Sequence, residues 1–233
     1  MDIRTPFEMR PGVPAYAAVR DVIRAEIMDG KISAGARLTT AFLVQRFGIS
    51  QMPVREALQA LEGEGLIRIL PHKGATVLSL DSKRVGNIYD LRGAVEALLV
   101  RKCLPNITNA AMAELSEIHR VLKDAVGRGE PKTVFDLNMK FHSLIYRHAQ
   151  NPEAEGVYDR YAKLLGTLRG RYGFSPFRMH QMVDEHDEIL DALRRQDEAE
   201  LDVLMRSHVE GAKLDLVSRI EIEEATPPKT GTR

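Results

Sequence analysis

The sequence has a single cysteine, no tryptophan and few aromatic residues, which make up 6% of its 233 residues. One cysteine excludes an intrachain disulfide, and a thiol catalyst would need unusual surroundings. Because Cys103 lies in a helical apolar pattern, we expect it to be buried in a structural role. The remaining composition, 44% hydrophobic and 28% charged, is typical of a globular protein rich in helix formers.

Long hydrophobic runs are also missing. No apolar stretch approaches the roughly 18 residues that a membrane span requires, and residues 1–10 lack the apolar core of a signal peptide. We therefore expect a cytoplasmic protein with no membrane partner. Charge of one sign is not in excess, because 33 Lys and Arg balance 33 Asp and Glu. Any argument for a nucleic-acid partner must therefore come from the pattern of residues and not from bulk charge.

Residues 1–80 show the pattern of a small winged helix-turn-helix domain. Apolar residues recur with helical spacing over 14–28, a short helix is expected over 39–46, and Gly48 ends it. Ser50 is expected to cap a third helix, in which Pro53 falls in the tolerant first turn. Two short strands, 66–69 and 75–78, flank a basic turn at 71–74 that predicts a wing.

The third helix and the wing supply candidate DNA contacts. Residues at the start of the second helix of such a pair approach base edges in the major groove. Arg55 can pair with guanine and Gln51 with adenine, whereas Met52 offers only apolar contact. Ser50, at the helix N-terminus, suits a phosphate, and His72 and Lys73 can lie along the backbone or in a minor groove. A small helical fold with a solvated charged face has the same pattern, so spacing alone leaves this alternative open.

Residues 81–222 indicate an antiparallel bundle of helices, so the fold class is mainly α with an all-α C-terminal domain. Six helices are predicted, at 82–103, 108–126, 132–149, 153–172, 177–195 and 197–220. Residues 223–233, which contain two prolines and a glycine, are expected to form a disordered tail.

The N-terminal segment resembles the DNA-binding domain of the GntR family. The resemblance rests on residues 35–38, Leu43, 47–50, the string Pro-Val-Arg-Glu-Ala-Leu at 53–58, Leu61, 65–67 and 73–74. It implies DNA contacts from Arg37, Ser50, Gln51, Arg55 and the wing residues His72, Lys73 and Gly74. Gln51 and Met52 stand where the family usually has Arg and Thr, so an operator known for relatives need not transfer. Arg37 has an alternative role, an ion pair with Glu56 or another carboxylate.

Three histidines and one asparagine are candidate metal ligands. Asn138 and His142 share one helix face, and His186 and His208 lie on the last two predicted helices, which can form a hairpin. Imidazoles and an amide oxygen can hold a divalent transition metal such as Zn²⁺ or Ni²⁺ with open positions. A lone helical histidine is, however, more often simply buried or exposed, and spacing alone leaves that alternative open.

The C-terminal segment resembles the FCD ligand-binding domain, in its six-helix VanR-like form, of the FadR branch of GntR regulators. The resemblance rests on Tyr89 to Arg92, Glu96, Phe141, His142, Asn151, Glu185, His186 and His208. It implies a metal held by Asn138, His142, His186 and His208, with Asn138 where many relatives carry Asp. Asp136 points to a different helical face and is not expected to substitute.

A polar stripe of Tyr89, Arg92 and Glu96 runs along the first predicted helix of the bundle. We interpret this stripe, with Tyr146 on the face of His142, as an effector-binding surface in which Arg92 meets a carboxylate. The alternative is a local Arg92–Glu96 salt bridge on the helix surface.

The sequence therefore predicts a homodimeric, ligand-responsive transcriptional regulator, with a repressor released by a small organic acid as the favoured form. Its partners would be a palindromic double-stranded DNA operator and a small carboxylate. A metal-binding helical enzyme is a weaker alternative, because neither a Glu-x-x-His pair nor His-Glu-x-x-His is present. A metal-bound helical adaptor without DNA affinity is the third possibility, and it fits the string at 53–58 poorly.

Overall fold

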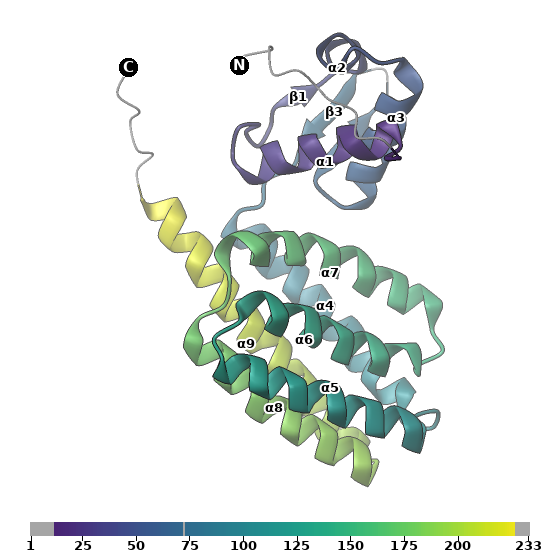
Figure 1. The fold of residues 1–233 in the computed structure, drawn as a ribbon, viewed down its shortest axis with the longest axis vertical. Helices are drawn as coiled ribbons and strands as arrows, with labels where there is room; N and C mark the ends of the chain where they lie inside the picture. The colour runs from purple at the N-terminus through teal and green to yellow at the C-terminus, as the bar shows by residue number, and fades with distance from the viewer. Residues whose placement is uncertain (1–11, 72, 227–233) are drawn as a thin grey trace. The chain divides into compact units, whose positions relative to one another are not determined.

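A computed structural model describes residues 12–71 and 73–226 of the chain. It divides into two compact units, Met1–Leu80 and Asp81–Arg233. Figure 1 shows helices as the main element of both, which confirms the mainly α fold class. His72, a candidate wing residue, lies outside the described residues.

The first unit is a winged helix-turn-helix. Its elements are α1 (Ala15–Met28), β1 (Arg37–Leu38), α2 (Thr40–Phe47), α3 (Gln51–Gly63), β2 (Ile67–Leu70) and β3 (Gly74–Val77). Helix α2 begins where Thr39 Oγ1 accepts a hydrogen bond from Phe42 N, and it ends at Gly48 in the left-handed conformation. The apolar stripe of α3, made by Val54, Leu58 and Leu61, is buried.

The sheet of this unit has the order β1-β3-β2 and is antiparallel throughout. Strand β3 is central, and it pairs Ala75 with Ile69 on β2 and Thr76 with Arg37 on β1. Strand β1 is absent from the elements expected from sequence, because two residues are too short for an alternating pattern. It attaches the N-terminal half of the unit to the wing.

The second unit is a bundle of helices, as expected. The helices described are α4 (Ser82–Cys103), α5 (Asn109–Gly127), α6 (Pro131–Arg147), α7 (Pro152–Tyr172), α8 (Pro176–Arg195) and α9 (Glu198–Ala225). Side chains of Asp81, Thr108, Asn151, Ser175 and Asp197 cap the N-termini of all but α6, which starts with a proline. The six helices start within one residue of the positions expected from sequence.

Helix α4 packs most extensively against α9, while α5 packs on α6 and α8 (Figure 1). Helix α4 also packs on α6 and α7, and α8 packs on α9. Among the described residues, no helix is both long and apolar enough to cross a membrane.

Helix α9 is longer than expected. The disordered tail placed at 223–233 was wrong for residues 223–225, which are helical, while 227–233 lie outside the described residues. Two contacts hold the last turns in place: Glu224 accepts hydrogen bonds from Ser82 N and Oγ at 2.9 and 2.8 Å, and Glu223 pairs with Arg171. These partners are remote in sequence, so local composition did not reveal them.

Gly74 makes a close backbone approach at the base of the wing. It has φ +79°, and a Cβ there would lie 2.5 Å from Leu38 O on β1. Gly35 has the same φ of +79° but would place its Cβ in open space. A side chain at Gly35 would therefore meet only backbone strain, whereas a side chain at Gly74 would meet the same strain and a steric clash with Leu38.

We expect Gly74→Ala to destabilise the β1–β3 pairing more than Gly35→Ala does. Both variants incur about 1–2 kcal/mol for a left-handed backbone, and Gly74→Ala adds ~1–3 kcal/mol of overpacking. Native-state hydrogen exchange of β1 and β3 amides measures the local free energy. Equal losses in the two variants would show that the approach to Leu38 costs nothing.

Candidate metal centre and nucleic-acid interface

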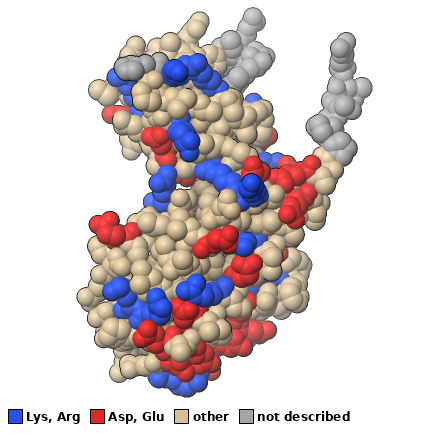
Figure 2. Space-filling view, turned by 180° about the vertical axis from the view of Figure 1, so that it is seen from behind, with Lys and Arg blue, Asp and Glu red and all other residues tan. Residues whose placement is uncertain are grey.

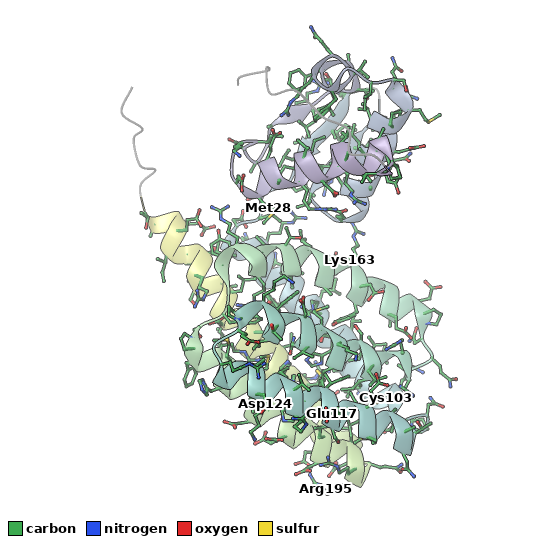
Figure 3. The ribbon with its side chains drawn as sticks, in the orientation of Figure 1. Met28, Cys103, Glu117, Asp124, Lys163 and Arg195 are labelled. Atoms are coloured by element: carbon green, nitrogen blue, oxygen red, sulfur yellow. The ribbon has the colours of Figure 1, made fainter. Side chains whose placement is uncertain are left out.

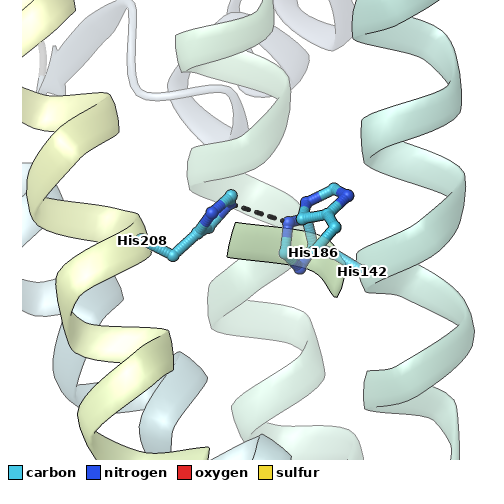
Figure 4. Close-up of side chains that lie close together, drawn as sticks. All are labelled: His142, His186 and His208. Atoms are coloured by element: carbon cyan, nitrogen blue, oxygen red, sulfur yellow. Dashed lines mark hydrogen bonds between the residues drawn. The ribbon is translucent and has the colours of Figure 1, made fainter. Parts of the chain in front are cut away.

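Three buried histidines from three helices meet in the core of the second unit. His142 lies on α6, His186 on α8 and His208 on α9, and one ligand atom of each lies within 4.8 Å of the other two (Figure 4). The Nε2 atoms of His142 and His208 are 3.0 Å apart. The three side chains are at most 5% exposed, so water cannot solvate them.

Burial keeps these imidazoles uncharged. It is the main cause that lowers the pKa of His142, His186 and His208 well below the ordinary value, and nearby Arg178 lowers each further. A neutral imidazole has a lone pair, which is the form that coordinates a metal. The cluster is therefore chemically ready to act as a ligand set.

Unpartnered polar atoms at the cluster indicate what would complete it. Within the described residues, His186 Nδ1 and Nε2 and Asn138 Oδ1 are buried and lack a hydrogen-bond partner. Asn138 lines the same cavity as His142 and His208. An unsatisfied buried polar atom costs free energy, and a divalent cation would satisfy one atom of each residue. The donor set, three imidazoles and an amide oxygen, therefore fits a transition metal. Asp136 is exposed and pairs with Lys132 at 3.0 Å.

A carboxylate and an arginine support His208. Glu185 Oε2 lies 2.6 Å from His208 Nδ1, and Arg178 pairs with Glu185 at 2.7 Å. Arg178 is 2% exposed and also donates to the backbone oxygen of His208. Sequence reasoning noted Glu185 only as part of a motif and missed Arg178, because an arginine in the first turn of a helix has no distinctive pattern.

The candidate effector residues lie beside the cluster. A cavity of about 40 Å³ is lined by Tyr89, Arg92, Asn138, His142 and His208, among others. Arg92 Nε donates to Glu96 at 2.6 Å, so the alternative of a local ion pair is realised, but Glu96 is 1% exposed and the pair lies inside the bundle. Tyr146 donates to the other Glu96 oxygen at 2.5 Å.

Arg169 is a cavity residue that sequence reasoning missed. It is 5% exposed and donates to Asp215, to Gly173 O and to Ala212 O. Its guanidinium lies 4.3 Å from the centre of the Phe174 ring. The contacts with Asp215 and Ala212 join segments more than forty residues apart, which no local pattern in the sequence could predict.

Some of the candidate DNA-contacting residues line one hollow of the first unit, and others are exposed at the start of α3. Ser50 precedes α3, and Gln51, Met52 and Arg55 are exposed on its first turns. A hollow of about 460 Å³ beside α3 is lined by Arg37, Arg55, Lys73 and Gly74, among others. Three cations around one hollow can hold phosphate oxygens.

Arg37 has a local partner that is not the carboxylate considered from sequence. Its Nε donates to Lys73 O at 2.7 Å, which ties β1 to the wing.

The surface charge of the helical unit differs from that of the hollow beside α3. Acidic and basic side chains are interspersed on the face of the helical unit seen in Figure 2. The cationic character relevant to DNA is therefore local, as the balanced net charge requires.

Cys103 is not available as a nucleophile. It is buried at the end of α4 (Figure 3), and its thiol donates to Val100 O at 3.0 Å. Burial raises the pKa of the Cys103 thiol to about 12, which keeps it protonated. The expected structural role agrees with this environment.

Two families of domain match the chain. Residues 15–77 match the family described as bacterial regulatory proteins, gntR family. Residues 87–211 match the FCD domain. The first match covers the winged unit, and the second covers most of the helical bundle with all four candidate metal ligands.

Curated relatives are transcriptional regulators. The repressor RspR of Escherichia coli K12 is 27% identical over 87% of this chain and 89% of its own length. The gluconate operon transcriptional repressor of Bacillus subtilis is 25% identical over 76% of this chain and 74% of its own length.

Solved structures share the fold. Escherichia coli McbR/YncC has a TM-score of 0.63 at 23% identity, covering 89% of this chain and 99% of that one. A second solved structure is that of Lar, a protein described as controlling the expression of the Listeria monocytogenes agr system. It has a TM-score of 0.62 at 15% identity, and the match covers 91% of this chain and 99% of that one.

We expect His186→Phe to stabilise the protein when metal is withheld. His186 stacks on Phe141 with ring centres 4.2 Å apart, so a phenyl ring can keep this contact. The substitution removes two unpartnered polar atoms and should raise the free energy of unfolding by about 1–3 kcal/mol. Urea denaturation in the presence of a chelator measures the change.

His142→Phe is the matched control. It removes an imidazole that contacts His208 and Tyr146, and it should lower the free energy of unfolding. If both variants are destabilised equally, His186 has partners in solution that the structure does not reveal.

Proposed function

Because the chain belongs to the gntR family of bacterial regulatory proteins and carries an FCD domain, we propose that it is a repressor released by a small carboxylate bound beside a metal. The chain is a DNA-binding transcriptional regulator and not an enzyme. The observation that carries the proposal is the cluster of three buried neutral imidazoles with the orphaned Asn138 oxygen, next to a cavity lined by arginines.

The winged unit would bind the operator through α3 and the wing. Gln51, Met52 and Arg55 would approach base edges in the major groove, while Ser50 suits a phosphate. Arg37 and Lys73 line the hollow beside α3 and would hold the sugar-phosphate backbone. Gly74 contributes through its backbone, because it permits the close approach to β1. A homodimer would present two such units to a palindromic operator.

The helical unit would hold Zn²⁺ or Ni²⁺ through Asn138, His142, His186 and His208. Four protein ligands leave open positions on a metal that accepts five or six. When bound, the metal supplies a cationic centre that attracts an effector oxygen. Arg92 lines the same cavity and would orient a second carboxylate oxygen. Its guanidinium carbon lies 5.4 Å from the centre of the Tyr89 ring and 5.3 Å from that of the Tyr158 ring.

The size of the cavity supports a switch between two states. About 40 Å³ holds only a few water molecules, so a larger effector requires the helices around it to move. An effector that binds the expanded arrangement more tightly shifts the population towards it, and this shift would change the presentation of the two winged units. The names of relatives point to gluconate and D-xylose utilization operons, which directs a search for the effector to sugars and sugar acids.

Arg55→Ala should weaken DNA binding by roughly 5- to 150-fold, equivalent to about 1–3 kcal/mol for a base contact. The probe is a duplex selected from random sequences by the parent protein, and fluorescence anisotropy over a range of salt concentrations measures the affinity. Lys31→Ala is the charge-matched control, because this exposed cation pairs with Asp29 and does not line the hollow. Identical losses in the two variants would mean that only net charge matters.

Elemental mass spectrometry should find about one Zn²⁺ or Ni²⁺ per chain of purified parent protein. The double variant His142→Ala, His208→Ala should lose it, because two of the imidazole ligands are gone. His148→Ala is the control, since His148 bonds to Leu144 O outside the cluster. A folded parent that takes up no metal after incubation with Zn²⁺ or Ni²⁺ would refute the metal site and leave the DNA-binding role intact.

A further inference from the structure

Two of the three clustered histidines are each attached to a carboxylate–arginine pair, and the third is not. His208 contacts Glu185, which pairs with Arg178. His142 contacts Tyr146, which reaches Glu96, and Glu96 pairs with Arg92. These partners come from outside the candidate ligand set, and they determine which nitrogen of each ring carries the proton.

The contact of His208 with Glu185 makes Nδ1 the donor. An ionised carboxylate only accepts hydrogen bonds, and the distance of 2.6 Å is that of a charge-assisted bond. Arg178 Nη2 lies 3.4 Å from the same nitrogen, but it donates to His208 O at 2.9 Å. The proton of the neutral ring is therefore on Nδ1.

The contact of His142 with Tyr146 has the same consequence. The hydroxyl of Tyr146 has one proton, and it points to Glu96 Oε2 at 2.5 Å. The sulfur of Met205, 3.4 Å away, is a weak acceptor by comparison. The Tyr146 oxygen can therefore only accept from His142 Nδ1, which lies 3.3 Å away.

Counting protons then shows what the two Nε2 atoms must do. A neutral imidazole has one N–H, and in both rings it is used by Nδ1. Both Nε2 atoms are therefore bare lone pairs, and they face each other across 3.0 Å. Two lone pairs in that position repel unless they share a proton or a metal ion. A metal ion leaves both outer hydrogen bonds in place, and it would also give the unpartnered His186 and Asn138 atoms a partner, which a proton shared by two rings cannot do.

We propose that Glu185 and the Tyr146–Glu96 pair are positioning residues that fix the Nδ1–H tautomers of His208 and His142 and direct both Nε2 atoms at the metal. This rests on the proposed metal site. Arg178 and Arg92 pair with the two carboxylates inside the bundle, which holds in place the groups that accept from His208 and from Tyr146. Glu96 and Tyr146 are not among the residues that line the cavity of Arg92 and Asn138, so we assign them this role behind the metal ligand in place of the effector contact predicted from sequence.

His186 provides the internal contrast. Neither of its nitrogens has a partner within the part of the chain that the structure describes, and its ring is placed by stacking on Phe141. Its tautomer can therefore adapt to the metal. The cluster combines two prearranged ligands with one adaptable ligand.

The test compares Zn²⁺ affinity in the full-length parent and in Glu185→Gln and Tyr146→Phe, by competition with a chromophoric chelator. An amide at position 185 places a donor against Arg178 or His208, and a phenylalanine at 146 leaves His142 Nδ1 without an acceptor. Loss of such outer partners typically weakens metal binding about 10- to 100-fold. Asp187→Asn is the matched control: Asp187 also accepts from a histidine, His119 at 2.8 Å, but that ring is outside the cluster. It should bind Zn²⁺ as the parent does.

Long-range ¹H–¹⁵N spectra of the Zn²⁺-loaded parent show directly which ring nitrogen of each histidine carries the proton. A purely structural role of Glu185 and Tyr146 would make no prediction about this tautomer. We expect protonated Nδ1 on both His142 and His208. An Nε2–H on either ring of the loaded parent overturns the inference even if the variants fail to fold. Unchanged Zn²⁺ affinity in both folded variants also overturns it, while the metal site itself stands. A parent that binds no metal overturns the site and the inference together.

Discussion

The burial of three uncharged imidazoles is the constraint on which the helical unit depends. Each ring has lost water, so its nitrogens must be satisfied by protein groups or by a ligand. The protein groups in contact with ring nitrogens are Tyr146 on α6, Glu185 on α8 and His208 on α9. Glu96 on α4 acts one step further out, by accepting from Tyr146. The relative placement of these helices is therefore determined by hydrogen-bond geometry as well as by apolar packing.

Much of the winged unit could be predicted from sequence, because its signals are local. Gly48 ends α2, and the spacing of Val54, Leu58 and Leu61 places the buried face of α3. Strand β1 could not be predicted in the same way. Its two residues become a strand only because β3 lies beside them, and Gly74 allows the approach.

The candidate site shows the same division between local and remote information. Asn138 and His142 are one helical turn apart, so their shared face follows from the period of the helix. A resemblance to a known family was needed to group them with His186 and His208. Arg169 and Arg178 were missed because their contacts with Asp215, Ala212 and His208 on α9 depend on how helices pack, and burial of an arginine cannot be read from its immediate neighbours.

The contact of Glu224 with Ser82 joins the end of α9 to the start of α4. Roughly 24 Å of continuous helix separates His208 from Glu224, at 1.5 Å per residue. Glu224 accepts hydrogen bonds from Ser82, the first residue of α4. Leu80, the last residue of the winged unit, lies two positions before Ser82 in the chain. This stretch of α9 is fixed at both ends within the helical unit, by the contact of His208 with His142 and by the contact of Glu224 with Ser82. A ligand that moves α9 at the cluster must therefore also strain the start of α4.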